Sequence, residues 1–211
     1  MNLQYKMKEI LQSDDYLSLP AYLCYLMKRL FAAIKIHPGE AFLGRYFSLK
    51  NKLKNEKIKW VDPENIHITL RFIGETPEHH IPAIVVALRQ AAHVFSAYEL
   101  SLSDTGIFGS SYKPRVIWFG LHDKGETADL AEKILSELEN TGFERDRQNF
   151  VPHLTVGRIK HLENKKYFQE VIDKYRESFL QKEEVTEFHL FESILRSQGP
   201  EYHIIESFKL I

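Results

Sequence analysis

The sequence predicts an α+β fold with two lobes, in which two mainly antiparallel β-sheets face each other across a central cleft and helices lie on the outside. Several neighbouring segments alternate apolar and polar residues without a helix between them, as half-buried strands of antiparallel sheets do. Amphipathic helical patterns separate the other strands. A succession of helix, strand and His-x-Thr strand occurs twice, with His67 and His153 86 residues apart. This repetition suggests two similar lobes.

The first half of the chain is expected to contain three strands and two helices. "RLFAAIKI" is an apolar run typical of a buried strand, and "HPGE" turns the chain into a helix with an apolar face from Phe42 to Leu53. "DPEN" forms a turn between two alternating segments, and Pro82 suits the first turn of a second helix. The expected strands cover 29–36, 57–61 and 66–73, and the second helix covers 81–95.

The second half is expected to contain five strands and two helices. The Gly/Ser-rich segment 105–114 is predicted to be a loop. Leu130, Ile134 and Leu138 form a helical stripe that Gly142 is placed to end. Apolar residues spaced from Tyr167 to Phe179 predict a last long amphipathic helix. The expected strands cover 98–104, 115–120, 151–158, 186–195 and 201–211.

Composition narrows the classes of function. Of the 211 residues, 44% are hydrophobic, and the net charge of -1 argues against nucleic-acid binding driven by bulk charge. Any anion site must therefore be a local group of basic residues. The single cysteine, Cys24, excludes an internal disulfide and a cysteine-based zinc site, and fits a reducing, cytoplasmic location. No stretch reaches the roughly 18 apolar residues of a membrane helix.

The two His-x-Thr segments carry the most specific signal. Residues two apart in a strand project to the same side, so that His67 and Thr69 share one face while the aliphatic residues between them face a core. His153 and Thr155 share a face in the same way. Chance gives roughly 0.1 such motifs in a chain of this composition, which makes two accidental copies rare.

Two histidines on facing strands suit proton transfer at a phosphodiester. Imidazole titrates near pH 6.5, so one ring can accept a proton from a nucleophile while the other donates one to the leaving oxygen. Threonine hydroxyls beside them can donate hydrogen bonds to phosphate oxygens. A strained cyclic phosphate needs no metal ion, because opening the ring already favours the reaction. Zinc hydrolase, deaminase, P-loop and dinucleotide-binding motifs do not occur in the sequence.

At these residues the sequence resembles the 2H phosphoesterase superfamily, and within it the RNA 2',3'-cyclic phosphodiesterases, also called 2'-5' RNA ligases. The resemblance runs over about residues 28–211. It is carried by "KRLFAAIKI", "WVDPENIHITLRFIGE", "PRVIWFG", "FVPHLTVGRI" and "ESILRSQGPEYHII". Residues 1–26 are expected to be an N-terminal extension outside it, and residues 27–211 a single bilobal domain.

The resemblance implies hydrolysis of 2',3'-cyclic phosphate ends of RNA or nucleotides to 2'-phosphomonoesters, without a cofactor or metal. The reverse reaction would join such an end to a 5'-hydroxyl. It implies His67 and His153 as the catalytic acid–base pair and Thr69, Thr155 and Arg158 as phosphate-binding residues. We further expect a monomer that does not associate with a membrane.

Strict alternation places Arg158 on the face opposite His153, so that a bulge or strand end at Gly157 is needed to bring it round. Arg71 has the right parity but is as readily explained as a solvated charge. Other candidates for RNA contact lie on loops, where such residues are more often ordinary surface or packing residues. They are Lys113, Arg115, Arg145, Arg147, Phe108 and Tyr112.

Two alternatives remain open from the sequence. The first is a phosphodiesterase that acts on another small cyclic phosphate, such as a cyclic nucleotide. The second is a module that binds RNA ends without turnover. Two intact His-x-Thr motifs weigh against the second alternative.

Overall fold

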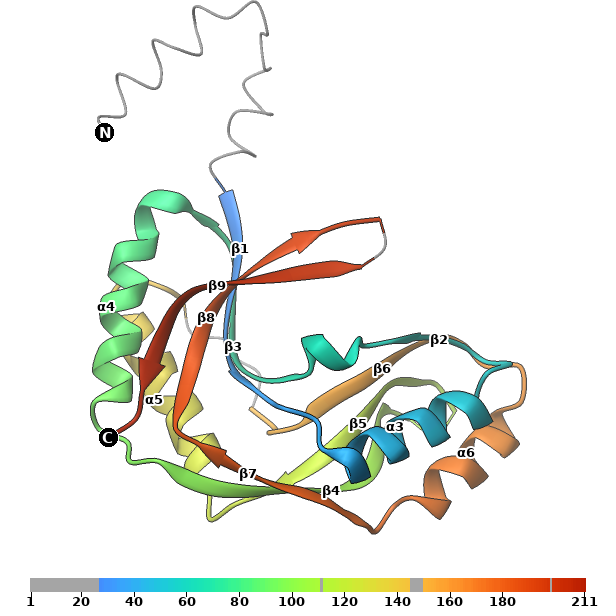
Figure 1. Cartoon of the computed structure of the whole chain (residues 1–211). Coiled ribbons are helices and arrows are strands. Elements are labelled where there is room, and N and C mark those ends of the chain that lie inside the picture. Colours follow the sequence, from blue (N-terminus) through green and yellow to red (C-terminus); the bar gives the residue numbers. More distant parts are fainter. Residues whose placement is uncertain (1–26, 111, 145–149, 198) are drawn as a thin grey trace, which may run out of the picture.

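The computed structural model describes residues 27–110, 112–144, 150–197 and 199–211 (Figure 1). These residues form two antiparallel sheets and four α-helices, as an α+β fold requires. The elements are β1 (Met27–Lys35), α3 (Glu40–Lys52), β2 (Lys57–Trp60), β3 (His67–Pro77), α4 (Ile81–Ala92), β4 (Tyr98–Gly109), β5 (Pro114–His122), α5 (Glu126–Asn140), β6 (Leu154–His161), α6 (Lys165–Lys174), β7 (Phe179–Val185), β8 (Glu187–Leu195) and β9 (Pro200–Lys209), with 3-10 turns at Pro63–Asn65 (η1) and Glu78–His80 (η2).

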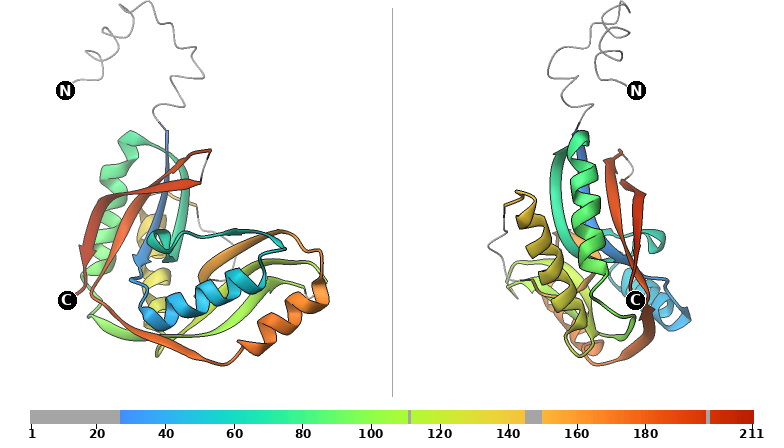
Figure 2. Two further views of the ribbon diagram at one scale, coloured as in Figure 1. Left: turned by 45° about the vertical axis from the view of Figure 1, so that its right-hand side comes forward. Right: turned by 90° about the vertical axis from the view of Figure 1, so that its left-hand side faces the viewer.

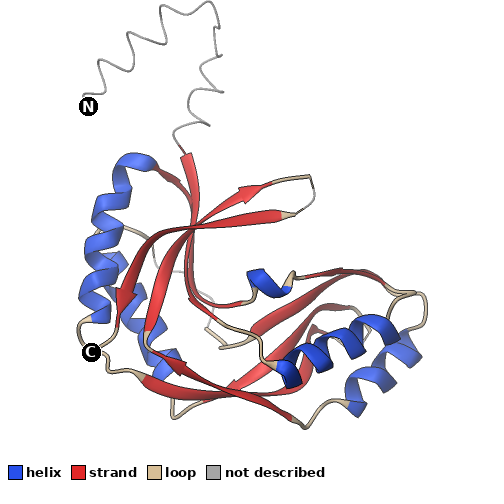
Figure 3. Cartoon of the chain, viewed as in Figure 1, coloured by secondary structure: helices blue, strands red, loops and turns tan. Residues whose placement is uncertain are grey.

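The chain passes between the two sheets several times. One sheet has the strand order β3-β1-β8-β9, and the other has the order β2-β6-β5-β4-β7. Figure 1 shows the two sheets set at an angle, with α4 and α5 beside the four-stranded sheet and α3 and α6 beside the five-stranded sheet. The views of Figure 2 and the colouring of Figure 3 confirm that these helices lie outside the two sheets. The prediction of two sheets with external helices is therefore correct.

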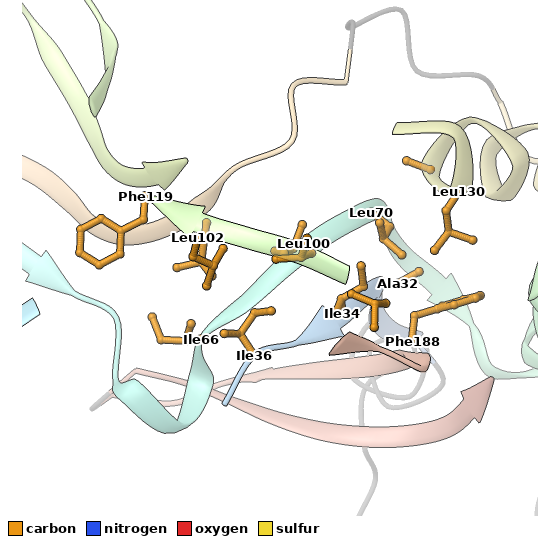
Figure 4. Packing of buried hydrophobic residues seen from close by; sticks show 14 of the residues in the cluster. Ala32, Ile34, Ile36, Ile66, Leu70, Leu100, Leu102, Phe119, Leu130 and Phe188 are labelled. Carbon is orange, nitrogen blue, oxygen red and sulfur yellow. The ribbon is translucent and has the colours of Figure 1, made fainter. Parts of the chain in front are cut away.

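One hydrophobic cluster joins the apolar faces of both sheets. Leu100 and Leu102 of β4 belong to the same buried cluster as Ile34 at the end of β1, and so do Leu130 of α5 and Leu70 of β3 (Figure 4). All five side chains are at most 4% exposed. Because this cluster is continuous, apolar contacts fix the orientation of one sheet relative to the other.

Several boundaries differ from the sequence-based expectation, and the first large difference lies in β4. The segment 105–114 was expected to be a loop, but β4 continues to Gly109 and pairs with β5. A bulge at Asp104, whose φ is 58°, interrupts the alternation and hides the strand in the sequence. Half-buried Ile107, which pairs with Ile117 of β5 and packs against the core, holds this continuation in the sheet.

The second difference is that the last helix is shorter than its apolar spacing predicts. It ends at Lys174 instead of reaching Phe179, which is 63% exposed. The chain then pairs with β4 as strand β7, a strand absent from the expectation. Pairing with a strand distant in the sequence thus overrides the local helical pattern. Likewise, the helix expected over 81–95 ends at Ala92.

Gly157 of β6 lies where no side chain fits easily. A Cβ atom at this position would lie 3.0 Å from Cγ2 of Ile58 and 3.3 Å from the ring of Trp60, both on the neighbouring strand β2. Gly44, by contrast, is exposed in the middle of α3 with no atom within 4 Å of an added Cβ. These two glycines therefore respond oppositely to the same substitution.

We expect Gly157→Ala to lower the free energy of unfolding by about 1–3 kcal/mol, because the added methyl group overpacks the contact with β2. The control Gly44→Ala should raise it by about 0.5–1 kcal/mol through the higher helix propensity of alanine. Urea denaturation followed by circular dichroism measures both changes. A Gly157→Ala protein as stable as the parent would contradict the tight packing of β6 against β2.

Candidate active site

His67 begins β3 on the face opposite the core. Ile68 and Leu70 are at most 4% exposed within the hydrophobic cluster, so that His67 and Thr69 lie on the other side of the strand. Several aromatic side chains surround the His67 ring: the ring centroids of Phe31 and Tyr202 lie 5.0 and 5.2 Å from the imidazole centroid. The imidazole is therefore held in an apolar setting.

His153 stands immediately before β6 in the five-stranded sheet. Leu154 and Val156 are fully buried, which directs His153 and Thr155 to the opposite face. The ring of Phe108 meets the His153 ring edge-on with a centroid distance of 4.6 Å. The two His-x-Thr motifs thus lie on separate sheets, each with its aliphatic residues in the common core.

Both imidazoles are oriented by a backbone carbonyl two residues upstream. Nδ1 of His67 lies 2.7 Å from the carbonyl oxygen of Asn65, and Nδ1 of His153 lies 2.7 Å from that of Val151. A carbonyl oxygen only accepts hydrogen bonds, so Nδ1 must be the donor in each case. The neutral form of each ring therefore leaves Nε2 unprotonated, and this nitrogen is able to accept a proton.

A β-bulge brings Arg158 to the face that carries His153. Gly157 pairs with Ile117 of β5, whereas Thr155 pairs with Trp118, so that one residue of β6 is extra at this point. The extra residue resets the alternation, and Arg158 is exposed while its neighbour Ile159 packs against the core. The bulge that the position of Arg158 required is therefore present beside Gly157.

The histidines of the two sheets lie within range of shared charges that affect their pKa values. Burial lowers the pKa of His67, the Asn65 carbonyl opposes this, and the charges of Arg158 and His153 lower the pKa further. Burial also lowers the pKa of His153, against the effect of the Val151 carbonyl and together with the charge of Arg158. Arg158 thus lies near both imidazoles, and the charge of His153 acts on His67 from the other sheet.

The two threonines complete the arrangement. The structure gives neither the Thr69 nor the Thr155 hydroxyl a hydrogen-bond partner within the described part of the chain, and both side chains are half-buried. Each lies two residues after its histidine on the same face of its strand. Among the residues that the structure describes, these two hydroxyls are therefore available to bind an anion beside the imidazoles, together with the guanidinium of Arg158.

The remaining candidates lie elsewhere or have other contacts. Arg71 donates a hydrogen bond to the carbonyl of Glu144, 3.0 Å away. The ring of Tyr112 lies 4.2 Å from the Lys165 ammonium group at the start of α6. Lys113 and Arg115 are exposed at the start of β5. Arg145 and Arg147 lie outside the described residues, as does the extension 1–26.

The aromatic group around His67 was not predicted from the sequence. Phe31, Phe191 and Tyr202 come from three strands, and the ring centroids of Phe31 and Phe191 lie 5.1 Å apart in a stacked arrangement. Burial raises the pKa of Tyr202, while the charges of Arg158 and Arg29 lower it. The available signal was the parity of Phe31, which falls between the core residues Leu30 and Ala32.

The described residues include neither a group of metal ligands nor a helix that could span a membrane. No three His, Cys, Asp or Glu side chains within the described ranges are grouped so as to hold a metal ion. None of the described helices combines the length and apolar character required to cross a membrane.

The arrangement joins proton transfer with anion binding. In its neutral form each imidazole has an unprotonated Nε2, and a cation and two hydroxyls accompany the rings on the same faces of the strands. These groups come from both sheets.

Comparison with known proteins agrees with this geometry. The family model of LigT-like phosphoesterases matches residues 40–118 and 122–202. The RNA 2',3'-cyclic phosphodiesterase of Archaeoglobus fulgidus is 36% identical over 152 residues, which cover 72% of this chain and 84% of that protein. The protein of the same name from Methanocaldococcus jannaschii is 33% identical over 178 residues, which cover 84% of this chain and 98% of the relative.

Solved structures share the fold. The Thermus thermophilus protein TT0787 superposes with a TM-score of 0.70 and 27% identity, over 86% of this chain and 97% of its own. Escherichia coli LigT, solved with 3'-AMP, gives a TM-score of 0.66 at 23% identity, over 87% of this chain and 98% of its own. The fold, the paired motifs and the family match agree with the resemblance to 2H phosphoesterases, and the chain belongs to the LigT-like phosphoesterase family.

Proposed function

We propose that this phosphoesterase hydrolyses 2',3'-cyclic phosphate ends of RNA or nucleotides to 2'-phosphomonoesters, with His67 and His153 as its acid–base pair. The observation that carries the proposal is that two imidazoles from separate sheets, each oriented by a hydrogen bond from Nδ1 to a backbone carbonyl, lie within range of the charge of Arg158. The names of relatives 31–36% identical to this chain support the substrate class. Residues 27–211 would form one catalytic domain, with 1–26 as an extension.

The reaction requires one proton transfer on each side of the phosphorus atom. The unprotonated Nε2 of one histidine removes a proton from water, and the water oxygen forms a bond to phosphorus. The bond from phosphorus to the 3'-oxygen breaks, and the other histidine, protonated, gives its proton to that oxygen. Thr69, Thr155 and Arg158 hold the non-bridging oxygens as negative charge increases on them. Ring strain favours the opening, so the mechanism uses no metal ion.

The same residues support the reverse reaction. In that direction the 3'-hydroxyl of the 2'-phosphomonoester attacks phosphorus and water leaves, which forms the cyclic phosphate again while the two histidines exchange roles. If a 5'-hydroxyl of a second RNA strand replaces water as the nucleophile, the product has a 2'-5' linkage. Both directions pass through the same arrangement of proton donor and acceptor.

The substrate has a defined electrostatic effect on this site. In the free enzyme, burial and Arg158 favour the neutral form of both imidazoles. A bound phosphate anion neutralises the charge of Arg158 and attracts a proton to the nearer ring, which raises the pKa of that ring. Binding of the substrate thus helps to generate the protonated histidine that the reaction needs.

Substitution of either histidine should abolish most activity. We expect His67→Ala and His153→Ala each to lower kcat on a nucleoside 2',3'-cyclic phosphate by about 10²–10⁴-fold, since each removes a proton-transfer group. His161→Ala is the matched control, because His161 ends β6 exposed and pairs with Glu163. Chromatography of the products distinguishes 2'- from 3'-phosphate.

Different outcomes separate the alternatives. Near-parental turnover in either histidine variant would contradict the mechanism. Hydrolysis of another cyclic phosphate in preference to the 2',3'-cyclic end would indicate a different substrate. Binding of such ends without hydrolysis by the unaltered protein would indicate a binding module.

The pH dependence should differ between the free and the bound enzyme. Because both pKa values are lowered in the free protein, the bell-shaped profile of kcat/KM should have its maximum below the ordinary imidazole value of about 6.5. The profile of kcat, which reports the complex, should have its maximum at higher pH. Steady-state kinetics over about pH 4.5–9, a range that extends to both sides of the imidazole pKa, tests this. A kcat/KM maximum at higher pH than that of kcat would contradict it.

Removal of the Arg158 charge should raise both histidine pKa values. We expect Arg158→Gln to raise the pKa of His67 and that of His153, because the positive guanidinium disfavours the protonated form of both rings. Arg29→Gln is the control, since the Arg29 charge acts on Tyr202 and is not among the causes that shift either histidine. Titration of the imidazole proton resonances by NMR measures the shifts. Equal effects of the two substitutions would contradict the action of the Arg158 charge on both histidines.

A further inference from the structure

A cavity lies beside the part of β4 that extends beyond β7, and its lining contains neither His67 nor His153. Its volume is about 400 Å³. Strand β4 supplies one wall, Trp118 of β5 a second, and the end of α6 with the turn after it a third. The lining residues are Asp104, Thr105, Gly106, Ile107, Trp118, Gln169, Ile172, Arg176 and Glu177.

The indole of Trp118 forms a flat wall of this cavity. It lies across Gly106, where a Cβ atom would stand only 2.1 Å from Cζ2 of the ring. Glycine at position 106 thus leaves the room that the ring occupies. Trp118 is itself only half-buried, and a planar aromatic group of this kind is a stacking surface for another planar group.

Two polar atoms in the lining residues lack partners. Oγ1 of Thr105 and Nε1 of Trp118 are buried and form no hydrogen bond within the described part of the chain. A buried polar group without a partner costs free energy, and such groups are rare in folded proteins. Because two such atoms occur beside one cavity, the stability of the folded chain alone does not explain why these residues are present there.

The backbone at the rim of the cavity is also unusual. Asp104 has a φ of 58° and is the one non-glycine residue with positive φ among the described residues. Nε2 of His122 donates to its carboxylate at 2.8 Å, and its own amide donates to the carbonyl of Ser178 at 2.8 Å. Contacts on two sides therefore hold a conformation that costs energy, as is frequent at binding sites.

Two of the lining residues, Gly106 and Trp118, lie on the face of the sheet that carries the histidine site. Thr155 pairs with Trp118, and Trp118 pairs with Gly106, so that these residues lie side by side on the same face. Two strand spacings separate Thr155 from Gly106, which is about 10 Å. Phe108 bridges the path, with ring centroids 5.6 Å from Trp118 and 4.6 Å from His153.

The charges of the lining favour an uncharged planar ligand over a phosphate. Asp104 and Glu177 supply carboxylates, and the guanidinium of Arg176 is already paired with Asp173. Asp104 is likewise paired, with His122. Arg176 is the one cation among the lining residues that the structure describes, and its charge is already matched, which leaves little to attract a phosphate group. A nucleobase, in contrast, offers an aromatic face for Trp118 and both donors and acceptors for the polar lining.

We propose that this cavity binds the base of the nucleotide that precedes the reacting end of an RNA strand. The inference rests on the proposed function, because it assumes that the terminal cyclic phosphate lies at His67 and His153. It adds a preference for RNA ends over free cyclic nucleotides and assigns that preference to Trp118 and the end of α6.

The test compares two substrates in one set of variants. A nucleoside 2',3'-cyclic phosphate reaches only the histidine site, whereas a dinucleotide that ends in a 2',3'-cyclic phosphate also reaches the cavity. We expect the ratio of kcat/KM for dinucleotide over mononucleotide to fall on the order of tenfold in Trp118→Ala and less in Trp118→Phe. Trp60→Phe, which alters a tryptophan on the far side of β6, should keep the parental ratio.

The two hypotheses fail in different ways. If the unaltered enzyme hydrolyses neither substrate, the proposed function is wrong. If it hydrolyses both and Trp118→Ala keeps the parental ratio, the cavity does not bind the preceding base. An unchanged ratio includes the case in which activity on both substrates falls by the same factor, because the effect of Trp118 would then lie at the terminal nucleotide.

Fluorescence gives a measure that does not depend on whether Trp118→Ala folds. The chain has two tryptophans, Trp60 and Trp118, so that Trp118 is the only one left in Trp60→Phe. A non-hydrolysable dinucleotide with a 2'-phosphate end should quench its emission more strongly than the corresponding mononucleotide. Equal quenching by the two ligands at saturation would contradict the proposal.

Discussion

The pleat of the two histidine strands is the constraint on which the site depends. In each strand the residues next to the histidine are anchored in one hydrophobic cluster, and the histidine and threonine are left on the other side. A slip of one residue in either strand would exchange the two faces and bury the imidazole. The precision of the site therefore comes from aliphatic packing that takes no part in the chemistry.

The shared core also explains how groups from two sheets meet. Leu100 and Leu102 of the five-stranded sheet are in contact, through one buried cluster, with Ile34 and Ala32 of the four-stranded sheet (Figure 4). This contact sets the angle between the sheets away from the histidines. The apolar side chains that stabilise the fold and the polar side chains of the site thus lie on opposite faces of the same strands. The polar groups of the site therefore do not have to be buried in the core.

Much of this arrangement was predictable from the sequence because it follows from local rules. The parity of His67, Thr69, His153 and Thr155 depends only on the extended backbone, and the structure has each pair on the expected face. Arg158 violated parity, and that violation itself predicted a bulge. The sequence shows such features because they involve residues that are neighbours along the chain.

The features that escaped prediction depend on contacts between distant residues. Strand β7 has an unremarkable polar sequence and forms because β4 offers a free edge. The aromatic group at His67 combines Phe31, Phe191 and Tyr202 from three strands, which no local pattern connects. The cavity beside Trp118 depends on a bulge at Asp104 and on the end of α6, and neither has a signal in periodicity.

The orientation of both imidazoles by main-chain carbonyls has a consequence for how such enzymes vary during evolution. The oxygens of Asn65 and Val151 belong to the backbone, so the side chains at these two positions are not required for holding the rings. Natural variants are free to drift there, provided that the turn geometry is kept. A search template that demands a carboxylate behind each histidine, as in many hydrolases, would overlook sites built in this way.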